Sequence, residues 1–378
     1  MVSSTSLRLS TVVPATRIGD ENRVHEVTNI DLAMKLHYIK GVYFFKNEAV
    51  EGLTIYDLKK PMFQLLQLYF TASGRIRRSE TGMPFIKCND SGVRIVEAHY
   101  EETVDEWSAR AMDDSSLFDG LAYNQALGPD LGYSPLVFLH SLGLKCGGMA
   151  VGLSWANVLR DAFSASAFMN MWGKIIAGQV PWKLLHVPLP GKPESPSLSS
   201  VPETPFSVKR VDPVGDFWVT QGWATFMAGG EFGTKNVHKG EFGVLSNDIV
   251  WSTVAADFLV AEAEVSDLVE LIVKKRAEEN GAIEETARRE EGGSNSDFIA
   301  YGAKLTFVNL EEAEIYGLEL KGQKPVYASY GISGVGDEGL VLVLPASTNN
   351  VGRLLSVVRP ENQLTQLKSE LQRNWSIA

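Results

Sequence analysis

The sequence predicts a mixed α/β protein, of the α+β kind, built from two domains. Helical and strand-like apolar patterns alternate along both halves of the chain. The length of 378 residues suggests more than one domain. Eight of the sixteen prolines fall in residues 181–213. Because proline fixes φ and removes a backbone donor, we interpret this stretch as a crossover linker between domains 1–180 and 214–378.

The first half begins with two predicted helices. Thr28 or Asn29 can cap a helix that starts near Ile30 and carries Leu32, Leu36 and Ile39 on one side. A second helix is predicted over Asp57–Ala72, where apolar residues recur on one face. The residues of that face are Met62, Leu65, Leu66 and Tyr69.

Two strands and a third helix follow. The strand-like runs Leu136–Leu144 and Met149–Trp155 flank the sequence Lys-Cys-Gly-Gly, whose glycines are typical of a hairpin turn. The apolar period then becomes helical over Ala162–Ala177. The segment Asn157–Asp161 is therefore predicted to be the loop between a strand and a helix.

The second half predicts further helices and strands. A charged helix is expected over Ala261–Asn280, followed by a polar surface segment at Glu284–Asn295. Strand-like runs occur at Ala303–Val308 and Leu340–Leu344, and a last helix is expected at Glu361–Arg373. No internal repeat is visible.

Composition excludes several classes of protein. The net charge of −11 argues against a nucleic-acid partner and against a general attraction to anionic membranes. Two distant cysteines, Cys88 and Cys146, indicate a reduced protein without disulfides. The N-terminus has no signal-peptide pattern, and no apolar run reaches transmembrane length. We therefore expect a cytosolic chain that reaches membranes only peripherally or through a partner.

The predicted loop carries a degenerate catalytic motif. Residues 152–164 resemble the H-x-x-x-D-G loop of the BAHD acyltransferases. In that family the histidine deprotonates an alcohol or amine that attacks an acyl-CoA thioester, and the aspartate is mainly structural. Here Asp161 matches the aspartate, while Asn157 stands at the histidine position and Ala162 at the glycine position. An amide has no basic nitrogen, so Asn157 is not expected to act as the base.

The remaining histidines do not supply a second copy of the motif. None of the six is followed by aspartate four positions later. Losing a general base typically lowers the rate by about 10²–10⁴-fold. A histidine from elsewhere in the chain that reaches the site in space stays open as an alternative. The family's second motif, D-F-G-W-G before Lys/Arg-Pro, is reduced to Glu319–Pro325, which keeps only its acidic start and its Lys-Pro pair.

The resemblance extends over nearly the whole chain. It includes Ser73–Ile76, Gly128–Asp130, Pro135–Val137 and the Lys239–Gly243 segment. It implies two similar domains of the chloramphenicol-acetyltransferase type joined by a crossover loop. Between about Val219 and Glu241 the family has a strand, a helix and a strand, where this chain has a short glycine-rich stretch. The resemblance therefore implies a shortened second domain.

Within the family, further segments resemble the eceriferum/glossy branch of wax proteins. This resemblance implies an accessory protein that works with a ketoacyl-CoA synthase at the cytoplasmic face of the endoplasmic reticulum and extends very-long-chain acyl groups. An accessory protein of this kind is expected to require no cofactor. The resemblance leaves open whether acyl-CoA is a substrate or a ligand. The segments are Asp31–Tyr38, Lys87–Gly92, Ser296–Phe298, Leu305–Leu310, Gly334–Asp337 and Leu340–Val343.

Other interpretations stay open at this point. Acyl-CoA-dependent O- or N-acyl transfer is the main alternative, so the residues leave open whether the chain is an enzyme. A truncated, inactive product is a third. Asn157 and Asp161 also fit ordinary loop residues beside a helix start. The Gly334–Gly339 glycines match a dinucleotide motif but precede a strand, which favours a plain turn. Gly74–Arg78 is interpreted as a solvated surface turn. No cysteine–histidine cluster has metal-ligand spacing.

Overall fold

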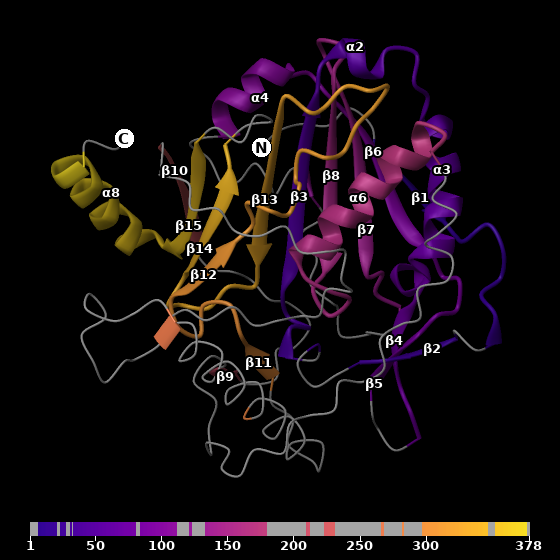
Figure 1. The fold of residues 1–378 in the computed structure, drawn as a ribbon, viewed down its shortest axis with the longest axis horizontal. Coiled ribbons are helices and arrows are strands. Elements are labelled where there is room, and N and C mark those ends of the chain that lie inside the picture. The colour runs from indigo at the N-terminus through magenta and orange to yellow at the C-terminus, as the bar shows by residue number, and fades with distance from the viewer. Residues whose placement is uncertain are drawn as a thin grey trace.

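The protein is described by a computed structural model. It describes residues 7–20, 23–27, 31, 33–80, 84–111, 121–122, 133–179, 209–211, 223–230, 266–267, 282, 297–346 and 352–375. Within these residues helices and strands alternate, as the predicted α/β class requires (Figure 1).

A six-stranded sheet forms the centre of the molecule. Strands β6 and β7 are parallel, and every other neighbouring pair is antiparallel. The neighbouring interior strands β8 and β3 are buried at every residue, because both of their faces are covered. In order across the sheet the strands are β1 (Arg8–Val12), β6 (Val93–Tyr100), β7 (Val137–Leu144), β8 (Met149–Ala156), β3 (Tyr38–Phe45) and β13 (Tyr327–Ser333).

The last strand of this sheet comes from the second half of the chain. Figure 1 shows β13 lying beside β3, with Tyr327 opposite Phe44 and Ser333 opposite Tyr38. The hydroxyl groups of Tyr43 and Tyr330 are 2.6 Å apart and hydrogen-bonded, and both are buried. The six-stranded sheet therefore draws on both predicted domains. The predicted domain boundaries themselves stay a prediction.

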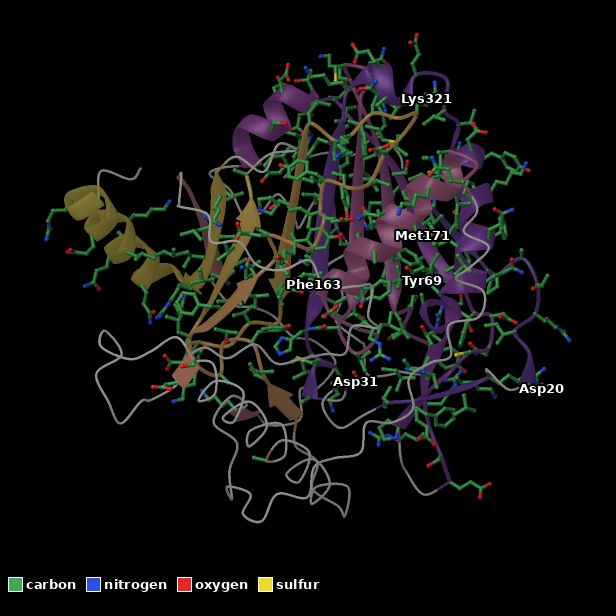
Figure 2. All side chains as sticks on the ribbon, viewed as in Figure 1. Asp20, Asp31, Tyr69, Phe163, Met171 and Lys321 are labelled. Carbon is green, nitrogen blue, oxygen red and sulfur yellow. The ribbon has the colours of Figure 1, made fainter. Side chains whose placement is uncertain are left out.

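Two helices, α3 (Ile55–Leu68) and α6 (Ala162–Ile176), lie against one another beside the sheet. The indole of Trp172 donates a hydrogen bond to the carbonyl of Leu58 at 3.1 Å. The ring of Phe168 meets the edge of Tyr69 at a centroid distance of 5.2 Å. Figure 2 labels Tyr69, Phe163 and Met171 in this layer. The apolar residues that repeat at helical spacing in the two segments therefore form the interface between α3 and α6.

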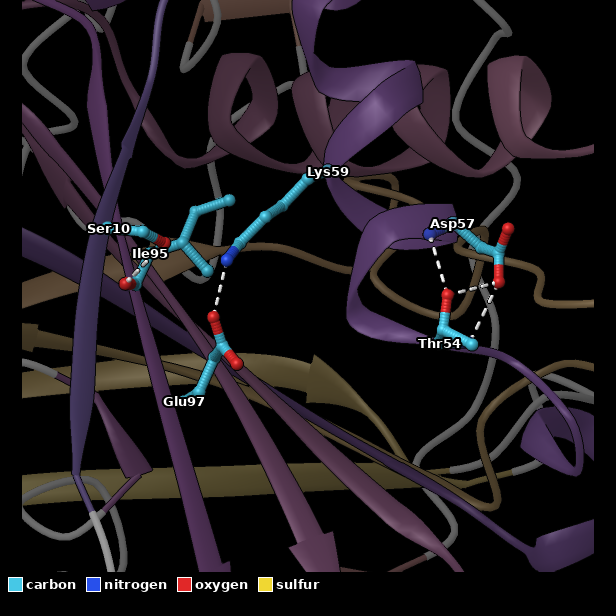
Figure 3. A network of polar contacts seen from close by, with 6 residues as sticks. All are labelled: Ser10, Thr54, Asp57, Lys59, Ile95 and Glu97. Atoms are coloured by element: carbon cyan, nitrogen blue, oxygen red, sulfur yellow. Dashed lines mark hydrogen bonds and ion pairs between the residues drawn. The ribbon is translucent and has the colours of Figure 1, made fainter.

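Helix α3 is fixed at its start and to the sheet (Figure 3). Thr54 and Asp57 form a reciprocal capping box, in which the Thr54 N–H donates to Asp57 Oδ2 at 2.8 Å and the Asp57 N–H donates to Thr54 Oγ1 at 3.3 Å. Lys59 forms an ion pair with Glu97 of β6. Together these contacts set both the first turn and the position of the helix.

A second sheet and two small ones complete the described elements. The second sheet has the order β10 (Trp223–Gly230), β15 (Arg353–Pro360), β14 (Leu340–Pro345) and β12 (Thr306–Asn309), with helix α8 (Glu361–Trp375) beside it. The small sheets are β2 (Val24–Glu26), β5 (Pro84–Lys87) and β4 (Arg75–Arg78), and the pair β11 (Asp297–Ile299) with β9 (Lys209–Val211). The short helices are α2 (Asn47–Val50), the 3₁₀ turn η2 (Phe70–Ser73) and α4 (Val104–Ala111).

Several predicted elements are confirmed. The helix predicted at Asp57–Ala72 appears as α3 and η2, and the last helix as α8. The predicted hairpin joins β7 to β8, and Gly147 in its turn has a φ of 80°. Gly334–Gly339 is a turn between β13 and β14, as expected. The helix predicted at 261–280 and the segment at 284–295 lie outside the described residues, apart from residues 266–267, which are helical.

Four expectations are wrong in whole or in part. The helix expected to begin near Ile30 does not extend to Ile39 as its apolar pattern suggested, because residues 34–36 form a turn and β3 already begins at Tyr38. Within Gly74–Arg78, residues Arg75–Arg78 form strand β4 rather than a solvated turn, and Arg75 is 3% exposed. The strand expected from Ala303 begins at Thr306. The glycine-rich interval after Val219 contains strand β10, paired with β15.

Candidate functional site

The loop after β8 holds both residues of the degenerate motif. Asp161 is the N-cap of α6, where its Oδ1 accepts a hydrogen bond from the backbone N–H of Ser164 at 2.9 Å. The indole Nε1 of Trp155 donates to the carbonyl of Arg160 at 2.9 Å. The strand, loop and helix follow the prediction, and both ends of the loop are fixed by hydrogen bonds.

Asn157 lies in the interior, with none of its surface exposed. Its backbone N–H donates to the carbonyl of His37 at 3.0 Å. Its side chain lies beside the hydroxyl of Tyr301 and influences the pKa of that group. The pKa of Tyr301 is raised to about 12, chiefly by burial; the neighbouring Asn157 side chain opposes this shift, and the negative charge of Asp161 adds to it. Both predicted site residues therefore act on one tyrosine from the second half of the chain.

The imidazole of His37 is the third member of this group. Its Nε2 accepts hydrogen bonds from the backbone N–H groups of Ala300 at 3.0 Å and Tyr301 at 3.2 Å. A nitrogen that accepts two hydrogen bonds carries no proton, so the proton of the neutral ring lies on Nδ1. Burial lowers the pKa of His37 to about 4, and the nearby backbone of Ser333 and Gly334 partly opposes this shift.

Close packing surrounds these side chains. The rings of His37 and Tyr301 meet edge to face, with centroids 4.8 Å apart and planes at 70°. Gly334 has a φ of 81°, and a Cβ on it would lie 2.3 Å from the carbonyl oxygen of Leu36. Only glycine fits there. We call Asn157, His37 and Tyr301 the Asn157 cluster.

None of the three side chains is suited to act as a general base. Asn157 has no basic nitrogen. The Nε2 of His37 is engaged by two backbone donors, and its low pKa makes it a weak base. Tyr301, with a pKa of about 12, keeps its proton at neutral pH. The cluster is therefore built for hydrogen bonding and packing between the two halves of the chain.

The sequence placed some of this site and missed the rest. It predicted the loop with Asn157 and Asp161, and the structure brings both to Tyr301. The sequence left open that a histidine from elsewhere in the chain reaches the site. His37 does lie next to the loop, but its ring is engaged by two backbone N–H groups and is not suited to act as the base. No local pattern marks Tyr301. Among the residues described, no group of three or more histidine, cysteine, aspartate or glutamate side chains is placed to hold a metal ion.

No helix in the described part of the chain combines the length and the apolar content that crossing a membrane requires.

Comparison with known proteins finds relatives that match nearly the full length of the chain. Protein ECERIFERUM 2 of Arabidopsis thaliana is 38% identical over 425 aligned residues, which cover 97% of each chain. Protein ECERIFERUM 26 of the same plant is 35% identical over 422 residues, covering 99% of this chain and 96% of its own. Both alignments are longer than this chain, so they leave gaps in it.

The fold and family follow from two further matches. The crystal structure of vinorine synthase superposes with a TM-score of 0.63 at 14% identity, covering 97% of this chain and 96% of that one, which shows a common fold. The family model described as the Transferase family matches residues 3–205, more than half of the sequence. The chain therefore belongs to the Transferase family, that of the BAHD acyltransferases.

Proposed function

We propose that this chain is an accessory protein of very-long-chain fatty acid elongation in cuticular wax biosynthesis, which acts with a ketoacyl-CoA synthase. The observation that carries the proposal is Asn157. An amide stands where the family places its base, and it is fully buried beside Tyr301. The full-length similarity to two ECERIFERUM proteins supports the same role.

The Asn157 cluster fits a role without acid–base chemistry. Through His37, its hydrogen bonds connect the loop before α6 and the start of β3 to the segment at residues 300–301. In this role the protein alters the chain length made by the synthase and requires no cofactor of its own, with acyl-CoA as a ligand at most. It meets the synthase at the cytoplasmic face of the endoplasmic reticulum, and the synthase holds it there.

Acyl-CoA-dependent transfer to an alcohol or amine is the second candidate function. The observation that favours it is the loop itself, since Asp161 caps α6 at the position where the family keeps its structural aspartate. Transfer in this chain needs an acceptor that is already nucleophilic, because the cluster supplies no base.

Co-expression in yeast separates the two functions. The chain and a plant ketoacyl-CoA synthase are expressed alone and together, and the acyl chains are measured by gas chromatography–mass spectrometry. We expect longer acyl chains with both proteins than with the synthase alone, and the same lengthening with Asn157→Ala at equal protein abundance. An unchanged acyl profile with abundant, folded protein would contradict the accessory role.

The second function has its own readout. Purified protein is incubated with acyl-CoA and alcohol or amine acceptors, and free CoA is measured. The accessory role predicts no acceptor-dependent CoA release from either the native chain or Asp161→Asn. Release that requires an acceptor and is lost in Asp161→Ala at a temperature where that variant is folded would establish transfer instead.

A further inference from the structure

The small sheet of β2, β5 and β4 carries cations on one side. Residues directly opposite in antiparallel strands share a face, and here Val24 and Arg75 both lie opposite Lys87, while Glu26 and Arg77 both lie opposite Phe85. The other side carries Ile76 and Ile86, which are buried in the core. We call the first side the basic face: Val24, Glu26, Arg75, Arg77, Phe85 and Lys87.

The innermost cation of this face is locked in place. The Arg75 guanidinium donates to the carbonyls of Gly74 at 2.7 Å, Gly92 at 3.0 Å and Ser91 at 3.4 Å. Burial, together with the positive charges of Arg94 and Arg77, lowers the pKa of Arg75 to about 10. Arg75 therefore sits in a positive field, and its own charge adds to that field.

Glu26 places one carboxylate among these cations, but no ion pair within the described part of the chain neutralises any of them. There, Arg75, Arg77, Lys87 and Arg94 have no ion pair with an aspartate or glutamate. Arg94 instead donates to the hydroxyl of Thr11 on β1. This local surplus of positive charge contrasts with the net charge of −11 for the whole chain.

Apolar and aromatic side chains lie among the cations. Val24 is 57% exposed and Tyr133 is 75% exposed. The Arg77 guanidinium carbon lies 5.5 Å from the centroid of the Tyr133 ring. Phe85, opposite Arg77, is half-buried. Cations next to exposed aromatic and aliphatic groups suit the boundary between lipid headgroups and acyl chains better than a fully hydrated polyanion.

We propose that the basic face docks this protein on the anionic surface of a lipid membrane. The cations Arg77 and Lys87 interact with phosphate headgroups, while Val24 and Tyr133 enter the headgroup region. In Figure 1 the small sheet protrudes at the lower right of the molecule, away from the second sheet and α8. The face would orient the protein on the membrane directly, in addition to any contact with a synthase.

Vesicle flotation with the purified full chain tests the proposal. The vesicles are phosphatidylcholine alone or phosphatidylcholine enriched in phosphatidylserine or phosphatidylinositol. Each cation near such a surface contributes about fivefold in affinity, so Arg77→Gln/Lys87→Gln is expected to weaken binding about 25-fold. The matched control is Lys145→Gln/Lys174→Gln, which removes the same charge from exposed positions in the β7–β8 turn and in the last turn of α6.

Val24→Ser/Tyr133→Ser provides a second test, since it keeps every charge and removes exposed apolar surface. It is expected to weaken binding to the anionic vesicles while leaving the salt dependence of binding unchanged. All variants are compared at equal far-ultraviolet circular dichroism and equal urea midpoint.

Three outcomes would overturn the proposal. The first is equal binding to neutral and anionic vesicles, or to neither. The second is an equal loss in the face variant and in the control. The third is binding to polyglutamate or heparin without binding to vesicles, which would assign the face to an acidic macromolecule. Since no synthase is present, failure here is independent of the proposed function.

Discussion

The backbone N–H of Asn157 donates a hydrogen bond to the backbone carbonyl of His37 at 3.0 Å. A histidine thus lies next to the position from which the family's catalytic histidine is missing. Its ring serves another purpose, because Nε2 accepts from the backbone N–H groups of Ala300 and Tyr301. His37 therefore connects the six-stranded sheet to a segment more than 260 residues away in sequence.

Removing this imidazole is expected to destabilise the protein. In His37→Ala the N–H groups of Ala300 and Tyr301 lose their buried acceptor, and each unsatisfied donor costs about 1–3 kcal/mol. The free energy of unfolding from urea titrations should fall by at least ~2 kcal/mol. His99→Ala, at an exposed position on β6, is the control and should change that free energy by no more than about 0.5 kcal/mol. Equal losses in both variants would contradict the connecting role.

Stability is expected to fall in mild acid. Burial lowers the pKa of His37 and that of His140 from 6.5 to about 4. Between these values the unfolded chain binds more protons than the folded one, so the free energy of unfolding rises with pH. The contribution is complete above pH 6.5 and is lost as pH falls toward 4, on the order of 3 kcal/mol per histidine.

His37→Gln removes one of these titrations and should flatten the slope of unfolding free energy against pH between 6.5 and 4. The measurement is a set of urea titrations across that range. A slope in His37→Gln equal to that of the native chain would show that His37 is not buried as a neutral ring.

Asp161 is expected to act through the start of α6. In Asp161→Ala the backbone N–H of Ser164 loses its acceptor, and the unfolding free energy should fall by about 0.5–2 kcal/mol. Asp161→Asn keeps an oxygen that caps the helix and should stay within a few tenths of a kcal/mol of the native value. Thermal unfolding of the two variants provides the comparison, and equal losses in both would argue that the charge of Asp161 matters more than the cap.

The Tyr43–Tyr330 hydrogen bond is expected to couple β3 to β13. Tyr330→Phe leaves the Tyr43 hydroxyl without this partner in the interior, which should cost about 1–3 kcal/mol of unfolding free energy. A double-mutant cycle with Tyr43→Phe should give a coupling of at least ~0.5 kcal/mol. Tyr56→Phe, at an exposed position, is the control and should leave the free energy of unfolding unchanged. Additive effects of the two buried substitutions would rule out the coupling.

Sequence patterns predicted those helices and turns that are determined by residues close together in the chain. The β7–β8 hairpin is marked by its glycines, and α6 by its helical period and the aspartate that caps it. The strand β3 was missed for a physical reason. All eight of its residues are buried, so it has no alternation of polar and apolar residues. In addition, Ile39 within the strand repeats at helical spacing with Leu32 and Leu36 before it, which favoured a helix.

Only the site residues that are close together in sequence could be predicted. Asn157 and Asp161 lie four residues apart in one loop, so a motif reveals them. Tyr301 and the ring of His37 join them through contacts between distant segments, and no spacing in the sequence encodes such contacts. Arg75 was interpreted as part of a solvated turn because its carbonyl partners at Ser91 and Gly92 come from a different segment.

The pairing of β13 with β3 also determines how the chain can be divided. A fragment that ends in the proline-rich stretch would expose the hydrogen-bonding edge of β3, a strand whose side chains are all apolar or buried. Such an edge is a template for aggregation. The segment at Tyr327–Ser333 thus serves as an intramolecular donor strand, and the N-terminal half becomes a finished folding unit only after most of the chain has been synthesised.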